Sequence, residues 1–583
     1  MKIIALICKV LVFTGLFVFI YFFYPFVFSQ QEEMQLFLFK NYLIEDLLLT
    51  PGGFCTVAGQ FLTQFYLFYS IAVLILAIIY YLIGYVFFLI LQQIYPQKYN
   101  LLLSIVPPFA LLIIQLNPGL VLDCAIGLLV LLVFLYYSFK WVNSTKRYFI
   151  WIGVIPVFYF LTGQLVVLFS ALFIVWAFLA KKEFRFYSLI ALVLALILAY
   201  WGVRLAVYLP LTDGVYSLRY QESQLLPESF IYYAWIRIGI LSVLLLLVCK
   251  LIGSLSSKRN VLNWTLTAIF CLSFAGYFVM SHPDSFNKQY RLYGHLAYLK
   301  RQNDWSGIEQ LIASQPKHSA LELNFLNMAL AQKGELLDRM FWYDQKGPQS
   351  LISPWNGTYY MSALLSDIHF YIGDISVSES YAMEALTLAK RGGSPRIMMR
   401  LIELNMLKGD WGVVKKYLSM LKEMPLYASW ANEKMETILN NEKASKVLWT
   451  KNPSKQLLSE LETETLWKNH LNEDPFNEIA FEYLASSYLL SKDVTKLNQL
   501  LEETPVYLDG KDVPVHIQEA LAIIAFDQER VISDRFVMDE TYRKKYDAFR
   551  QDFVKEASKA NGYLTMHQKY GNSYWFYYYC KQI

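Results

Sequence analysis

The sequence predicts an all-α protein: a polytopic transmembrane bundle of about nine helices, followed by an extracytoplasmic domain of helical repeats. Residues 1–280 contain nine apolar runs, whereas residues 281–583 have a mixed, soluble-type composition. In the second half, apolar residues recur every three or four positions between short turns. A chain of 583 residues is expected to form more than one domain. We therefore predict a bundle over 1–280 and a repeat domain over 281–583.

The two halves differ in charge. Residues 1–280 carry 16 Lys or Arg and 9 Asp or Glu, whereas residues 281–583 carry 35 and 38. The net charge of +4 is thus the sum of a basic half and an acidic half, and it does not indicate a nucleic-acid partner. Membrane topology explains the basic residues of the first half better.

The nine apolar runs are candidate membrane spans, because a helix needs about 20 residues to cross a hydrocarbon core of ~30 Å. The first run has no small-residue cleavage site and is too long for a signal peptide, so we predict a retained anchor. The shorter runs are expected to tilt or to insert only partly. The runs lie at 3–28, 64–91, 101–116, 118–139, 148–163, 164–180, 186–208, 231–252 and 261–280.

Lysine and arginine positions orient the predicted bundle. With a cytoplasmic N-terminus and alternating spans, twelve basic residues face the cytoplasm, and only Lys40, Arg204, Arg219 and Arg237 face outward. This orientation places residues 281–583 outside, together with two long loops at 29–60 and 209–230. The predicted location is the inner membrane of a bacterium, with the C-terminal domain in the periplasm and the lipid bilayer as a partner.

The second half contains a recurring turn. It falls at Asp304, Gly334, Gly373, Gly409 and Asp493, with spacings of about 30 to 40 residues and one interval twice as long. Such a period is typical of helix pairs that bury their apolar faces against neighbouring pairs.

This pattern resembles tetratricopeptide repeats. Small residues such as Ala382 and Ala385 stand where paired helices approach closely, and Pro316, Pro425 and Pro505 close three of the second helices. The resemblance implies a concave groove that binds a peptide or an envelope protein. A spacer or lid packed on the membrane half is the equally weighted alternative. Six consecutive aromatic residues, 574–579, are expected to fill the core of a helix pair rather than to stack on sugars.

Candidate chemistry in the first half is restricted to carboxylates and arginines. All seven histidines lie in the second half, which excludes a histidine base or a histidine-bound metal in the bundle. No Cys-x-x-Cys pair, phosphate-binding glycine loop or serine nucleophile motif is present. Only Cys55 and Cys580 are placed outside, and whether they pair is left open.

Four carboxylates stand in the first outward loop: Glu32, Glu33, Glu45 and Asp46. Residues 34–44, between the two pairs, are predicted to form a helix along the membrane surface. Partial desolvation there favours the neutral form of a carboxylate and so increases its basicity. Such a group can act as a general base or bind a divalent cation, with Mg²⁺ or Mn²⁺ as the candidate cofactor.

Three outward arginines, Arg204, Arg237 and Arg219, are candidates to hold a lipid-linked phosphate in a forked grip. A charge inside a membrane span is costly and is treated as functional by default. Asp123, near the outer end of the fourth run, is a candidate partner for Arg204 or Arg237. That pair would either belong to the site or lock two helices together.

On these residues the membrane half resembles the GT-C superfamily of integral-membrane glycosyltransferases. The resemblance implies a lipid-phosphate sugar donor and a catalytic carboxylate at Glu32 or Glu33, with Glu45 or Asp46 as second candidates. Two features depart from the superfamily: a Glu-Glu pair replaces the usual Asp-containing pair, and nine helices are fewer than many members have. The expected function is therefore transfer of a lipid-linked glycan. The alternative is a non-enzymatic anchor whose repeats recruit envelope proteins.

Overall fold

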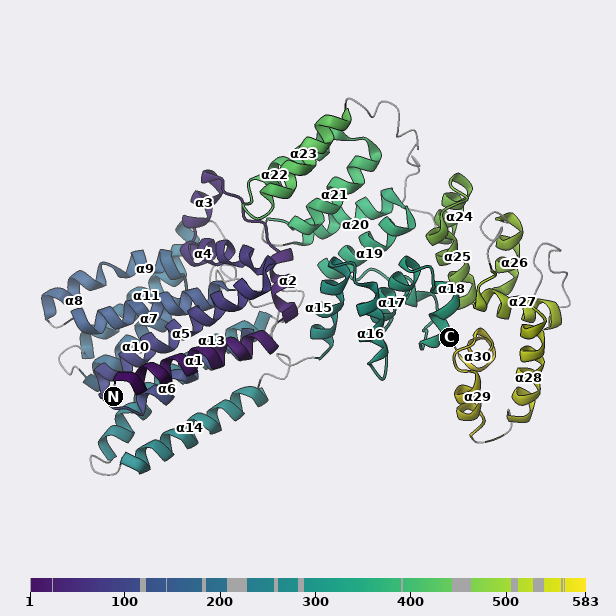
Figure 1. The fold of residues 1–583 in the computed structure, drawn as a ribbon. Coiled ribbons are helices and arrows are strands. Elements are labelled where there is room, and N and C mark those ends of the chain that lie inside the picture. Colours follow the sequence, from purple (N-terminus) through teal and green to yellow (C-terminus); the bar gives the residue numbers. More distant parts are fainter. Residues whose placement is uncertain are drawn as a thin grey trace. The chain divides into compact units, whose positions relative to one another are not determined.

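The chain is described by a computed structural model in which every extended element of the described residues is a helix and no strand forms (Figure 1), which confirms the all-α prediction. The description omits residues 1, 24, 116–121, 143, 181–184, 207–227, 256–259, 282–287, 390–391, 443–462, 505–511, 528–538, 557–558, 560 and 583. Two compact units form. Unit 1 comprises Met1–Gly294, Lys390–Pro395 and Leu418–Glu436, and unit 2 comprises His295–Ala389, Arg396–Tyr417 and Thr437–Ile583.

Most of unit 1 is a helix bundle. Its helices are α1 (Lys2–Phe23), α2 (Pro25–Glu33), α3 (Asn41–Leu48), α4 (Gly53–Thr63), η1 (Gln64–Leu67), α5 (Tyr69–Ile94), α6 (Asn100–Gln115), α7 (Asp123–Trp141), α8 (Thr145–Ile152), α9 (Ile155–Thr162), α10 (Leu165–Ala180), α11 (Arg185–Ala206), α13 (Glu228–Leu255) and α14 (Asn260–Ser281).

The fifth predicted run, 148–163, is not one helix. It divides into α8 and α9, each eight residues and thus about 12 Å long. The break follows from the sequence, because Gly153 ends α8 and Pro156 lies in the first turn of α9, where its missing N–H is tolerated. Neither helix is long enough to cross a membrane by itself.

Two helices among the described residues, α5 and α7, are long and apolar enough to cross a membrane. Other apolar helical segments of the described chain are shorter, including Asn100–Gln115, Leu165–Leu179, Phe186–Tyr200 and Leu262–Tyr277. The described residues thus support two of the nine candidate spans, and the other seven stay predictions.

The predicted surface helix over 34–44 is wrong. Residues 36–40 form no helix, and α3 begins only at Asn41. Leu36, Phe37 and Leu38 are all buried. Segments of unit 1 that are distant in the sequence contact these residues: the Phe39 N–H donates to the Glu423 carbonyl at 3.4 Å, and Gly392 packs on the Leu36 backbone. This long-range packing outweighs the local helical pattern.

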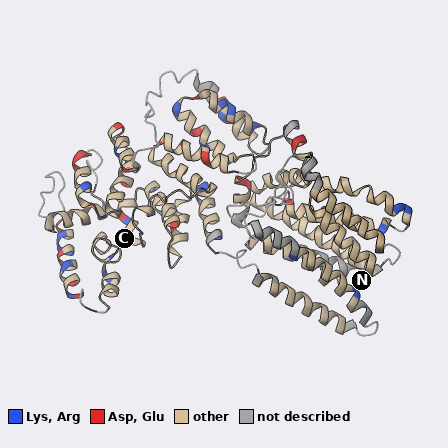
Figure 2. Ribbon diagram, turned by 180° about the vertical axis from the view of Figure 1, so that it is seen from behind, with Lys and Arg blue, Asp and Glu red and all other residues tan. Residues whose placement is uncertain are grey.

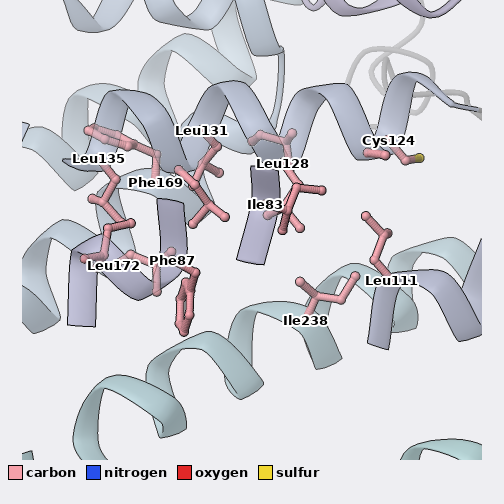
Figure 3. Packing of buried hydrophobic residues seen from close by; sticks show 14 of the residues in the cluster. Ile83, Phe87, Leu111, Cys124, Leu128, Leu131, Leu135, Phe169, Leu172 and Ile238 are labelled. Atoms are coloured by element: carbon pink, nitrogen blue, oxygen red, sulfur yellow. The ribbon is translucent and has the colours of Figure 1, made fainter. Parts of the chain in front are cut away.

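The core of the bundle is built by α5, α6, α7, α10 and α13 (Figure 3). In Figure 3, Ile83 of α5 points toward Leu128 of α7, and Phe87 and Leu131 are buried in the same cluster. Small residues such as Ala72 and Ala77 are buried on the same helix, α5.

Several helices of the bundle are also apolar on the face that is not packed against other helices. Exposed large apolar residues follow helical spacing on four helices: Ile71, Leu74, Ile78 and Leu82 on α5; Leu189, Val193 and Ile197 on α11; Ile240, Leu244, Leu247 and Leu251 on α13; and Leu262, Leu266, Ile269 and Leu272 on α14. In Figure 2, long stretches of the described bundle helices carry no charged residue. A helix that is apolar all round is typical of a membrane span or of the interior of a large core.

The helices after the bundle follow one another closely along the chain. They are α15 (Lys288–Arg301), α16 (Trp305–Ala313), α17 (Ala320–Gln332), α18 (Leu336–Arg339), η4 (Met340–Trp342), η5 (Pro348–Ser350), α19 (Tyr359–Ile372), α20 (Ile375–Leu388), α21 (Pro395–Lys408), α22 (Trp411–Lys422), α23 (Ala428–Glu442), α24 (Thr463–Glu473), α25 (Glu478–Leu490), α26 (Val494–Glu503), α27 (Val515–Asp527), α28 (Glu540–Glu556), α29 (Gly562–Tyr570) and α30 (Tyr574–Cys580).

All five predicted turns are present, and they share one geometry. At each turn, a residue with positive φ is followed by an acidic residue whose N–H donates to the carbonyl five positions earlier. Four of the acidic side chains then cap the next helix by accepting the N–H three positions on. The pairs are Asn303-Asp304, Gly334-Glu335, Gly373-Asp374, Gly409-Asp410 and Lys492-Asp493, and Glu335 is the member without the cap.

Unit 2 is not an open row of repeats. In a solenoid each repeat contacts only its neighbours, whereas α25 packs against α17, α18 and α19, and α18 packs against α27. Four of the six aromatic residues of α30, 574–577, are buried: the Trp575 indole donates to the Glu519 carbonyl at 2.7 Å, and the Tyr577 hydroxyl donates to the Leu490 carbonyl at 2.8 Å. As expected, these rings fill a core.

Candidate functional site

The carboxylates that end α2 are buried. Glu32 is 2% exposed and Glu33 is 1% exposed. The Tyr427 hydroxyl donates to Glu32 within unit 1, and the Ser29 hydroxyl donates to Glu33 at 3.4 Å. Burial of an ionised carboxylate is costly unless hydrogen bonds compensate it. The first of the two predicted acidic pairs is therefore desolvated and held in place.

A short polar path connects α2 with α4 and α7. Gln35, just after α2, donates from its side-chain amide to the Gln60 carbonyl of α4 at 3.0 Å. The neighbouring Gly59 packs against Asp123, which is fully buried at the start of α7. A Cβ atom at Gly59 would lie only 1.9 Å from the Asp123 Oδ1 atom. These two contacts connect the region of Glu32 and Glu33 with that of Asp123 only indirectly, through Gln35, Gln60 and Gly59, and we call the three buried acids the carboxylate cluster.

Asp123 acts on the groups around it. Burial, and then the charge of Asp123, raise the pKa of the Cys55 thiol to about 12. The Cys55 thiol donates to the Leu161 carbonyl at 3.2 Å and is fully buried. Cys55 and Cys580 are both free thiols in this structure. The Cys55 thiol is thus protonated and occupied by a local contact.

Tyr66 belongs to the same region, and sequence reasoning missed it. Its ring packs edge-on against Phe28 of α2 at 4.9 Å between centroids, and it interacts electrostatically with Asp123. The Tyr66 hydroxyl is buried and has no hydrogen-bond partner among the described residues. Gln60, Thr63 and Gln64, three or four positions apart at the edge of an apolar run, were the available sequence signal.

The second predicted acidic pair is in a different environment. Glu45 and Asp46 lie on α3, and both are exposed. They are therefore not part of the buried carboxylate cluster. Because residues 36–40 form no helix, these two carboxylates are not on a helix continuous with the end of α2.

Of the three candidate arginines, only Arg237 has a described side chain. Arg237 lies on α13 and is half-buried. Arg204 lies within α11, but its side chain is outside the described residues, and Arg219 is outside them entirely. Most of the predicted loop 209–230 is also outside the described part of the chain. The proposed phosphate grip therefore stays a prediction.

The described residues contain no set of ligands for the predicted divalent cation. In the described part of the chain, no three His, Cys, Asp or Glu side chains lie close enough together to hold a metal ion. We therefore assign no step of a reaction to Mg²⁺ or Mn²⁺.

Comparison with known proteins gives a family without an assigned activity. A sequence model of DUF6057, described as a family of unknown function, matches residues 1–581. The chain belongs to the DUF6057 family. No curated protein and no solved structure matches it. Because the match extends over both units, the bundle and the helical domain are features of one DUF6057 architecture.

The DUF6057 chain also has a pocket at the far end of α7 from Asp123. Its volume is about 520 Å³, and Phe134, Tyr137, Trp141, Trp151 and Val154 line it together with Ser138 and Lys140. Asp123 and Trp141 are the two ends of a 19-residue helix, which is about 28 Å long. This mostly apolar pocket is thus separate from the carboxylate cluster.

Proposed function

We propose that this DUF6057 protein is a multi-pass protein of a bacterial inner membrane that transfers a sugar from a lipid-phosphate donor. Glu32 or Glu33 is the catalytic base, and Arg237, with Arg204 and Arg219, binds the donor phosphate. The N-terminus lies in the cytoplasm, and the carboxylate cluster and unit 2 lie on the periplasmic side. The single observation that carries the proposal is the burial of Glu32, Glu33 and Asp123 within one bundle.

Membrane insertion is supported by the apolar exterior of the bundle. An aqueous protein rarely exposes continuous apolar stripes such as Ile71, Leu74, Ile78 and Leu82 on α5. Lipid removes the cost of that exposure. Helices too short to span alone, such as α8 and α9, are tolerated at membrane depth where neighbouring helices cover them.

The buried carboxylates support the catalytic proposal, because burying a charged group costs free energy. Acids buried in an apolar bundle are costly even when they have partners, and functional sites are where such groups concentrate.

The proposed reaction needs one proton acceptor and one anion grip. The acceptor hydroxyl forms a bond to the anomeric carbon, and its proton passes to Glu32 or Glu33. The bond between that carbon and the phosphate oxygen breaks, and its electron pair leaves on the lipid phosphate. An arginine beside the phosphate stabilises this developing charge.

The test is a complementation series in a strain that lacks the gene, with envelope glycans read by mass spectrometry. Glu32→Gln and Glu33→Gln keep the shape of the side chain but remove the base, so at least one should lower the product by about 10²-fold or more. Glu45→Gln and Asp46→Asn separate the buried pair from the exposed pair. Asp547→Asn, an exposed position of α28, is the neutral control. Normal glycans from both cluster variants at wild-type protein level would exclude the enzymatic proposal.

One contact favours the alternative, a scaffold whose tetratricopeptide-like repeats recruit an envelope protein. The hydrogen bond from Tyr427 gives Glu32 a structural task, because it holds the segment Leu418–Glu436 on the bundle. If that is its main role, Tyr427→Phe and Glu32→Gln should each lower the free energy of unfolding by about 1.5–3 kcal/mol. The double variant should then cost no more than either single change, and envelope glycans should stay normal.

A further inference from the structure

The pocket of about 520 Å³ at the end of α7 has a buried floor and an exposed rim. Trp151 of α8 and Val154, which joins α8 to α9, form one side of it. Ser138 and Trp151 are each 2% exposed, whereas Tyr137 is 60% exposed. The other side is formed by residues three or four positions apart on the last two turns of α7: Phe134, Tyr137, Ser138 and Trp141. The pocket therefore opens on the surface of the bundle.

The polar groups of the floor already have partners. The Trp151 indole donates to the Ser138 hydroxyl at 2.7 Å, and that hydroxyl donates to the Phe134 carbonyl at 2.6 Å. The Phe134 ring stacks on Phe158 with 4.4 Å between centroids. A ligand in the pocket thus meets mainly apolar surface. A hydrocarbon chain suits such a lining better than a peptide, whose backbone amides would need hydrogen-bond partners.

The rim carries a positive charge. Lys140 lines the pocket, is exposed and forms no ion pair with the described residues. The chain contains no Asp or Glu between Asp123 and Glu183, whereas Lys146 and Arg147 follow Lys140 closely in the sequence. The helices α8, α9 and α10 and the later turns of α7 therefore bring no carboxylate to this region. The rim complements an anionic group, and the lining below it complements an apolar one.

The position of the pocket along α7 suits a lipid. This helix is long and apolar enough to cross a membrane. In a membrane its last turn, with Lys140 and Trp141, lies where hydrocarbon gives way to water, a depth at which Trp and Tyr are enriched. Exposed apolar residues continue from the pocket along α9, at Val154, Val157 and Phe160. A bound acyl chain would thus have apolar surface to follow beyond the pocket.

We propose that this pocket binds one anionic phospholipid, with an acyl chain against Trp151 and Val154 and the head-group phosphate on Lys140. The inference rests on the membrane insertion proposed above and not on the reaction assigned to Glu32 and Glu33. Lysine supplies a point charge for the phosphate, and removal of the chain from water stabilises the complex. An inorganic phosphate ion lacks the apolar part, and a lipid with no net charge matches the cationic rim less well.

The test uses the full chain in a nonionic detergent, with bound lipid measured by native mass spectrometry. Phosphatidylglycerol and phosphatidylcholine with identical acyl chains are titrated separately, so that only the head group differs. One phosphatidylglycerol per chain should bind saturably and at least ten-fold more tightly than phosphatidylcholine. Lys140→Gln should remove that preference. Val154→Trp places a larger side chain in the lining and should weaken binding of phosphatidylglycerol at least ten-fold. Lys98→Gln, at an exposed lysine of unit 1 outside the lining, is the matched control and should leave binding unchanged.

Equal affinity of the wild-type protein for the two lipids would overturn the proposal, and this result needs no variant to fold. Equal losses from Lys140→Gln and Lys98→Gln would also overturn it, because general surface charge would then explain the preference. Displacement of phosphatidylglycerol by sodium phosphate at matched ionic strength would contradict the role of the acyl chain. The readout is bound lipid and not glycan, so failure of this proposal is distinguishable from failure of the proposed transferase reaction.

Discussion

Gly59 and Asp123 approach so closely that a single added carbon atom cannot fit between them. A Cβ atom at Gly59 would lie 1.9 Å from Asp123 Oδ1 and 3.0 Å from the Asp123 Cα atom, so side-chain rotation alone cannot relieve the clash. We expect Gly59→Ala to lower the free energy of unfolding by about 1–3 kcal/mol. Thermal and denaturant unfolding in detergent would measure this change.

Gly276→Ala is the matched control, because Gly276 lies within α14 and an added Cβ meets nothing within 4 Å. Replacing that helical glycine should leave stability unchanged or raise it by up to ~1 kcal/mol. The double variant Gly59→Ala with Asp123→Ala should recover part of the loss. If Gly59→Ala were as stable as Gly276→Ala, the close contact between α4 and α7 would be wrong.

Lys300 gives unit 2 a pH dependence with a defined sign. Burial lowers its pKa to about 7 in the folded chain from near 10.5 when unfolded, so between these values the unfolded state binds more protons. Stability should therefore rise with pH from about 7 to 10, with a slope of up to ~1.4 kcal/mol per pH unit from this residue. Lys300→Met should remove that part of the slope. Parallel pH profiles of wild type and Lys300→Met would contradict it.

Single residues also show where sequence reasoning stops. Glu32, Glu33 and Asp123 were predictable candidates, because acids beside apolar runs are unusual. Tyr427 was not, since it reaches Glu32 from almost 400 positions away and its own neighbourhood looks like any repeat helix. Glu45 and Asp46 are an adjacent acidic pair like Glu32 and Glu33, yet they lie on α3, beyond a non-helical segment, and are exposed. The sequence pattern identifies acidic residues beside apolar runs, but tertiary packing decides which of them are buried away from water.

At the scale of elements, the acidic caps of unit 2 are individually testable. Asp304 accepts the Gly307 N–H at 2.9 Å, and Asp493 accepts the Lys496 N–H at 3.0 Å. Replacing either residue with alanine leaves one helix-end donor without its cap, so each change should cost about 1 kcal/mol. Asparagine at the same positions should keep most of the stability. Chemical unfolding with Asp547→Ala as the surface control would measure these effects, and equal costs for alanine and asparagine would exclude capping.

Helix positions were largely predictable, and the exceptions have local or long-range causes. The run 186–208 corresponds to α11 and the run 231–252 lies within α13, because long apolar runs admit little else. The run 148–163 was predicted as one helix because it is apolar throughout. It divides at Gly153 and Pro156, two residues that commonly end or start helices. The helix predicted over 34–44 does not form, because Leu36 and Phe37 are buried in unit 1 with a non-helical backbone. Local propensity is overridden wherever distant segments supply the packing.

At the scale of the whole molecule, the proposed sidedness makes a topological prediction. Alkaline phosphatase, which is active only outside the cytoplasm, should be active when it is fused after residue 583. It should be inactive when fused within 256–259, which the lysine and arginine pattern places in the cytoplasm. A fluorescent reporter that folds only in the cytosol should give the opposite pattern. A cytosolic C-terminus would remove both the periplasmic site and its lipid-linked donor.

Closure of unit 2 by α30 is a second prediction at this scale. Trp575 is 3% exposed and packs on Tyr546 and Phe549 with centroid distances of 5.4 and 6.0 Å. Trp575→Ala should therefore cost about 3–5 kcal/mol. Tyr563→Ala, at an exposed aromatic position of α29, should cost much less. Circular dichroism of both variants during thermal unfolding would measure the difference, and equal melting temperatures would contradict a structural role for α30.

The place of α30 in that core also constrains the order of events at biogenesis. Residues 574–577 leave the ribosome after every helix that they cover, so unit 2 cannot complete its interior while those helices are being made. If the chain is exported, this delay is useful, because a protein-conducting channel passes unfolded polypeptide more readily than a finished domain. The core of unit 2 would then close only after residues 574–577 are made, when translocation is nearly over.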